Sequence, residues 1–281
     1  MGSVSFRGTA IARCLPAVLA AVAAVLATLF VVGPRILAGP VPGGSDDDGI
    51  GDAFRTAFLT YWQSDVRTFP PSLQAAVDYW FRYHVAKAVF AALALIVLAA
   101  LATLLWKSFL NSASLEAGRR IAGATAAVFV TACTLASMLL VLANIQGALA
   151  PFSSLLPMLM DDESNPDLAT AIDQARTQAD AYPSTRTQPA TQVMIDDFAW
   201  YHLIMAVLTG LVAVAALAAI MLSWRRFRRT DPTDRSTRRT LLSFTIATLL
   251  LTLTMLVVAT ANALTTATPA PALAALLNGG W

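Results

Sequence analysis

The chain has only two histidines, and both stand in the same sequence context. His84 lies in DYWFRYHVAKAV and His202 in DDFAWYHLIMAV, each directly after a tyrosine and at the start of a long apolar run. Imidazole nitrogens bind haem iron, other metal ions and polar groups of ligands, so two histidines at one level could act on one bound species. Whether they do depends on the elements that position them.

Those elements are predicted to be membrane-spanning helices. The 281 residues are 57% apolar and 13% charged, whereas roughly a quarter of the residues in a soluble domain are charged. Five runs have the ~20 apolar residues that a bilayer crossing needs: 11–32, 85–106, 121–148, 201–224 and 241–264. Because backbone groups in lipid must bond within their own segment, these runs are expected to be helices.

Charge asymmetry predicts the orientation. Seven arginines fall within residues 225–239, and Lys107, Arg119 and Arg120 occupy the other short connection. The two longer loops are acidic, and no charged side chain follows Leu264. The positive-inside rule then predicts a cytoplasmic N-terminus and an extracytoplasmic C-terminus. We interpret the arginines as this topology signal and expect no nucleic acid partner.

The chain is also expected to contain an internal duplication. A gapless shift of 118 residues aligns the histidines, two Trp-x-x-Phe pairs (Trp106 with Trp224), two Ala-Asn pairs (Asn144 with Asn262) and two prolines. Both copies enter the membrane in the same direction, which implies a pseudo-two-fold axis along the membrane normal. The predicted fold class is therefore all-α integral membrane, with two tandem parallel helical hairpins forming a four-helix bundle beside an N-terminal helix.

The predicted organisation has six segments. Residues 1–32 are an N-terminal transmembrane helix, interpreted as an anchor or uncleaved signal. The rest comprises an extracytoplasmic loop at 33–83, hairpin repeats at 84–150 and 201–268, an acidic extracytoplasmic loop at 151–200 and an extracytoplasmic tail at 269–281. Both loops are expected to be helical. Phe54, Phe58, Tyr61 and Trp62 define an amphipathic helix in the first, and Asn165–Pro166 starts a helix in the second.

Spacing places the polar candidates at one depth. Each histidine precedes an aligned tryptophan by 22 residues, or ~33 Å of helix, which is one crossing. The candidate ligand-binding residues at the outer level are His84, His202, Asn144, Asn262, Tyr83, Tyr201 and Lys87.

Several interpretations of this level stay open. It could be an aromatic belt with polar helix ends, a site for a lipid, quinone or other amphiphile between the hairpins, or a bis-histidine haem site. A metal ion alone is disfavoured, since neutral asparagines are poor ligands. Lys87, whose aligned partner is Met205, could snorkel to the interface or bind an acidic group. We assign no catalytic residue and leave the cofactor unknown.

The YHxxxAV helix starts at Tyr83 and Tyr201 and the ANIQGALAP segment at 143–151 resemble uncharacterised multi-pass membrane proteins of actinobacteria. A histidine at a helix start with an outer asparagine is also similar to the anthrone-oxygenase-like membrane family. In that family an arginine follows the histidine by three residues, where this chain has Lys87 and Met205. The second resemblance implies a membrane enzyme.

Two function classes follow. The first, which we favour, is a non-catalytic multi-pass protein of the bacterial cytoplasmic membrane: a scaffold, an accessory subunit of a membrane-protein partner, or a binder of a lipid-like amphiphile. The alternative is a membrane oxidoreductase or oxygenase that uses the two histidines. The spans hold no deep Asp, Glu, Lys or Arg, and ion-coupled transporters generally need such groups. Alanine richness and arginine in place of lysine indicate a bacterium of high GC content.

Overall fold

The protein is described by a computed structural model of residues 5–43, 49–111, 117–161, 165–184 and 186–279. Within these ranges it is helical, with no strand, as the sequence predicts. The elements are α1 (Ser5–Ala38), α2 (Ile50–Gln63), α3 (Pro71–Leu110), α4 (Ala117–Leu149), α5 (Pro151–Leu155), the 3₁₀ helix η1 (Leu156–Asp161), α6 (Pro166–Asp180), α7 (Pro189–Arg229), α8 (Arg235–Ala267) and α9 (Pro269–Leu277).

Five of these helices are long and apolar enough to cross a membrane: α3, α4, α7, α8 and residues Cys14–Ala38 of α1. Four contain the predicted spans, and the first segment overlaps the predicted span 11–32 but begins at Cys14 and continues to Ala38. Large apolar side chains on their outer faces are exposed, among them Ile96, Phe129, Val214 and Val257. Such faces would be costly in water and are favourable against lipid tails, so the fold is that of a multi-pass membrane protein.

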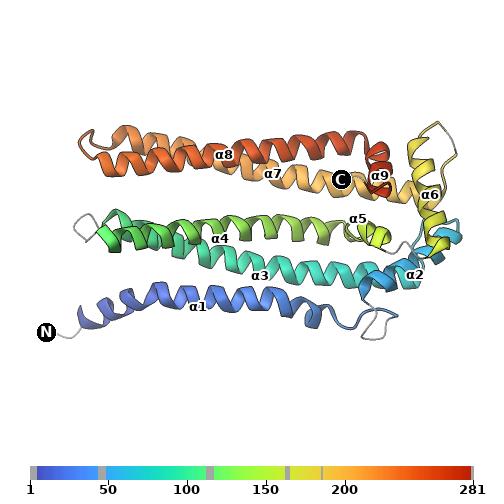
Figure 1. Ribbon diagram of the computed structural model, residues 1–281, viewed down its shortest axis with the longest axis horizontal. Helices are drawn as coiled ribbons and strands as arrows, with labels where there is room; N and C mark the ends of the chain where they lie inside the picture. Colours follow the sequence, from blue (N-terminus) through green and yellow to red (C-terminus); the bar gives the residue numbers. More distant parts are fainter. Residues whose placement is uncertain (1–4, 44–48, 112–116, 162–164, 185, 280–281) are drawn as a thin grey trace.

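The long helices lie side by side, and the short helices gather at one end (Figure 1). Helices α3 and α4 form one antiparallel hairpin and α7 and α8 form another, while α1 packs on α3. Helices α3 and α7 run in the same direction, away from the short helices. We call the end with α2, α5, α6 and α9 the cap end, and the end where α3 and α7 finish the loop end.

The cap has a hydrophobic core of its own. Phe54, Phe58 and Tyr61 of α2 are fully buried, as the helical spacing predicts. They pack with Phe152 and with apolar residues of η1, α6, α9 and the first turns of α3 and α7. The predicted helix at Asn165–Pro166 is α6, and the Asn165 side chain accepts from the Asp167 and Leu168 amides. This end of the molecule is therefore a packed helical layer.

Three helices, α3, α7 and α9, include residues that the sequence did not place in helices. Helices α3 and α7 begin at Pro71 and Pro189, thirteen residues before the histidines, because proline at the first helical position starts each helix. The residues after the last span form α9 and bury Leu273 and Leu277 in the cap core. The segment predicted as a tail is thus part of the cap.

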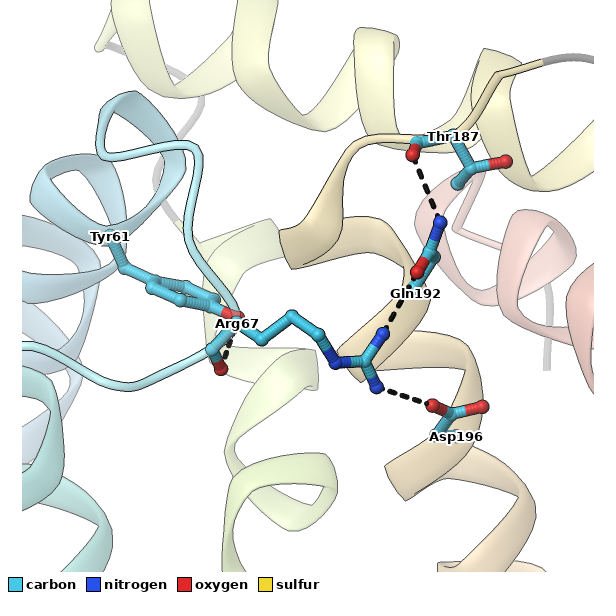
Figure 2. Close-up of polar contacts among 5 residues, drawn as sticks. All are labelled: Tyr61, Arg67, Thr187, Gln192 and Asp196. Atoms are coloured by element: carbon cyan, nitrogen blue, oxygen red, sulfur yellow. Dashed lines mark hydrogen bonds and ion pairs between the residues drawn. The ribbon is translucent and has the colours of Figure 1, made fainter.

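Polar contacts connect the cap to the second hairpin. Arg67, between α2 and α3, donates to Gln192 Oε1 at 2.8 Å and pairs with Asp196 at 2.9 Å, both on α7 (Figure 2). Its carbonyl oxygen accepts from Tyr61 Oη at 3.3 Å. Gln192 also donates to the Thr187 carbonyl oxygen. Arg67 thereby links the chain before the first hairpin to the start of the second.

Equivalent helices start or end at matching positions. Helices α4 and α8 end at Leu149 and Ala267, which are 118 residues apart. The same offset separates the starts of α3 and α7, and of α5 and α9. At the loop end, one hairpin places Arg120 over the Phe109 ring and the other places Arg238 over the Phe227 ring. Aligned residues thus make the same contact in both hairpins.

Candidate functional site at the cap end

His84 is held inside the first hairpin. Its Nδ1 donates to the Trp80 carbonyl oxygen, one turn earlier on α3, at 3.1 Å. The ring packs edge-on against the Trp80 ring, with centroids 4.6 Å apart. Its other edge faces Gly147 of α4, where an added Cβ would lie 2.5 Å from Nε2. Only glycine admits the imidazole at this distance.

His202 has a similar ring contact but a different hydrogen bond. It packs edge-on against Phe198, with centroids 4.5 Å apart. Its Nδ1 donates to Asn262 Oδ1 on α8 at 2.7 Å, while the Asn262 amide donates to the Val258 carbonyl oxygen. In a neutral imidazole this leaves Nε2 as the acceptor. The bond fixes both the tautomer and the orientation of the ring.

The two asparagines are therefore not equivalent. Asn144 is buried and donates to the Leu140 carbonyl oxygen of its own helix at 2.7 Å. In the described part of the chain no hydrogen bond joins it to His84. Each histidine thus makes its contacts within its own hairpin, one with a backbone carbonyl and the other with an asparagine.

A pocket opens beside His202. Its volume is about 260 Å³, and it lies between α7, α8, α9 and the α5–η1 segment. Its lining residues are Ser153, Pro157, Phe198, Tyr201, His202, Thr265, Ala272, Ala275 and Leu276. Thr265 occupies the position that aligns with Gly147. We call this cavity the His202 pocket; it combines an apolar wall with a few polar groups, as ligand sites commonly do.

Tyr83 and Lys87 lie on a different side of α3. Lys87 Nζ is 4.9 Å from the centroid of Phe30 on α1 and 5.0 Å from that of Tyr83. The Tyr83 ring also stacks on Trp80. Lys87 is half-buried, and within the described ranges it forms no ion pair with a carboxylate. The seven predicted site residues thus occupy one end of the molecule but face different neighbours.

Three contacts here were not among the predicted site residues. Half-buried Asp197 of α7 accepts from the amide and hydroxyl of Ser153 at 2.8 Å each and so caps α5. Gln146 of α4 donates to the Tyr201 carbonyl oxygen at 3.0 Å. Trp200 Nε1 donates to the Leu149 carbonyl oxygen at 3.1 Å. The last two contacts join the first hairpin to α7, and no sequence pattern indicated any of the three, because each pairs residues more than 40 positions apart.

Several polar groups at this end surround a largely apolar cavity. The His202 pocket offers an imidazole, a phenol and two hydroxyl groups against an apolar wall. Within the described ranges no group of three or more His, Cys, Asp and Glu side chains is placed to hold a metal ion. The arrangement is suited to a small molecule with an apolar body and a polar group.

Fold and site together define a multi-pass helical membrane protein with a helical cap. No protein-family model matches the chain, and no curated protein or solved structure matches it significantly. The function is therefore inferred from this chain's own residues.

Proposed function

We propose that this chain is a non-catalytic multi-pass protein of the bacterial cytoplasmic membrane, which binds a lipid-like amphiphile beneath a cap on the outer face. The observation that carries the proposal is the His202 pocket. At about 260 Å³ it is close to the lower end of the ~300–1,000 Å³ range of ligand sites. It would hold a ring or a short chain segment with one polar group, and not a whole phospholipid.

The outer location is supported by charge. The seven arginines of residues 225–239 and Lys107, Arg119 and Arg120 belong to the loop end. The positive-inside rule assigns that end to the cytoplasm. The cap, the pocket and the C-terminal helix α9 then face outward, while α1 begins in the cytoplasm.

The proposal includes an internal duplication. It is supported by the common offset of the helix starts and by the paired Arg–Phe and histidine–aromatic contacts. The duplicated hairpins have since diverged at the cap end, where Gly147 of one copy aligns with Thr265 of the other. Gly147 contacts the His84 ring, whereas Thr265 lines the His202 pocket.

The enzymatic alternative is an oxidoreductase or oxygenase that uses both histidines, with haem as one version. It receives less support, because the Nε2 edge of His84, the edge that an iron ion would need, packs against Gly147 within its own hairpin. A scaffold or accessory subunit with a membrane-protein partner would use the cap surface and leave the pocket empty.

Native mass spectrometry of the full chain, extracted in mild detergent, tests the proposal. An amphiphile enriched over bulk lipid should co-purify with the wild type. His202→Ala and Ala275→Phe, which remove and fill part of the pocket, should lose it. His84→Ala is the matched control and should retain it. Loss in His84→Ala alone, or no enriched molecule in the wild type, would contradict binding in this pocket.

A further inference from the structure

We propose a second site, beyond the proposed function: a groove between α1 and the first hairpin holds an acyl chain of an anionic lipid from the surrounding membrane, with the headgroup at Lys87. The groove has a volume of about 620 Å³. Ala24, Ala27 and Phe30 of α1 form one wall, α3 contributes Ala94 and Leu98, and α4 contributes Ala136. Its size is within the range of ligand sites.

The groove exists because α1 packs on α3 while α4 forms the opposite wall. Small side chains on all three helices leave space that neighbouring side chains do not fill. The α1 wall runs from Ala20 to Val31, or ~16 Å at 1.5 Å per residue, about half the hydrocarbon thickness. It matches the depth of one leaflet, and the lining is almost entirely apolar, which suits an acyl chain.

Lys87 supplies a positive charge at the cap end of the groove. Its ammonium lies over the ring of Phe30, which lines the groove. It stands one turn from Ala91, another lining residue. The side chain is half-buried and has no carboxylate partner in the described part of the molecule. A partly desolvated ammonium beside an acyl-chain groove attracts a negatively charged headgroup.

The second hairpin provides an internal comparison. There the aligned residue is Met205, which packs against a small apolar cluster of Leu142, Ala213 and Met255. The helix α1 packs on α3 of the first hairpin. The charge is therefore present in the hairpin that has the groove and absent from its counterpart. A lysine that only snorkels to the interface would not require this correspondence, and would not distinguish headgroups.

The test uses native mass spectrometry of the full chain exchanged into equimolar phosphatidylglycerol and phosphatidylcholine with matched chains. The wild type should retain phosphatidylglycerol preferentially. Lys87→Met, which installs the residue of the second hairpin, should lower that preference about fivefold. Lys107→Met, which alters the other lysine at the loop end, should leave the preference unchanged.

Groove-filling variants test the contribution of the acyl chain separately from that of the headgroup charge. Ala27→Trp and Ala136→Phe change exposed alanines on two helices, and both should reduce retention of both lipids. His202→Ala should have no effect here, which distinguishes this site from the His202 pocket. Equal retention of the two lipids by the wild type, or an unchanged preference in Lys87→Met, would overturn the proposal. So would a membrane protein crosslinked in the groove in place of lipid.

Discussion

The two histidines illustrate how a shared position can acquire different neighbours. His84 and His202 make the same edge-on contact with an aromatic ring four residues earlier. That contact is local to one helix, so sequence alignment could anticipate it. The partner on the second helix differs, because Gly147 admits the His84 ring while Asn262 bonds His202. Only the packing of helices shows this difference.

Gly147→Ala should destabilise the protein. The new Cβ would lie 2.5 Å from His84 Nε2 and closer still to Cδ2, so the ring or the helix must move. We expect a loss of ~1–3 kcal/mol in thermal unfolding of the detergent-solubilised chain. Gly123→Ala on the same helix has no neighbour within 4 Å and should be neutral or stabilising.

A double substitution tests whether the His84 ring causes the loss of stability in Gly147→Ala. If the His84 ring is the obstacle, Gly147→Ala should cost much less in a His84→Ala background. An equal cost in both backgrounds would show that the clash lies elsewhere.

Tyr61 should make stability depend on alkaline pH. Burial raises the pKa of Tyr61 to about 12, from 10.0, partly offset by the positive charge of Arg67. A raised folded-state pKa means that this contribution is complete below pH 10 and is lost as pH rises toward 12. Thermal unfolding across this range should show a smaller decline in Tyr61→Phe. Tyr182→Phe, at an exposed position, should follow the wild type; identical profiles for all three would contradict this role.

At the scale of elements, features that depend on local sequence patterns could be predicted, and features that depend on long-range packing could not. The spans and α2 follow from apolar runs and helical spacing, which act within one segment. Helix α9 could not be recognised as part of the cap, because PAPALAALL is short and its burial depends on α6 and α7. The His202 pocket was also beyond reach, since its lining residues range from Ser153 to Leu276 and meet only when four segments pack together.

The stability of the cap should depend more on its apolar core than on the Arg67–Asp196 ion pair. Phe58 is fully buried, and Phe58→Ala should cost ~3–5 kcal/mol of local stability. Arg67 and Asp196 are 54% and 67% exposed, so Arg67→Gln should cost at most ~1 kcal/mol. Amide hydrogen exchange of α2 measures both. A larger effect of Arg67→Gln would mean that the polar link in Figure 2 holds the cap in place.

At the scale of the molecule, five spans place the start of α1 and the helix α9 at opposite ends. The loop end carries the arginine-rich segment 225–239, and the cap end carries the candidate binding pocket. The proposed function depends on the cap facing the outside of the cell. An amphiphile site in the outer half of the bilayer requires it.

Cysteine labelling in intact cells tests this orientation most directly. In a background with Cys14 and Cys133 replaced by serine, Thr177→Cys on α6 and Thr233→Cys between α7 and α8 each supply one thiol at an exposed position. A membrane-impermeant maleimide should label Thr177→Cys in intact cells and Thr233→Cys only after permeabilisation. Labelling of Thr233→Cys in intact cells, with protection of Thr177→Cys, would place the cap in the cytoplasm and contradict an outer-face binding protein.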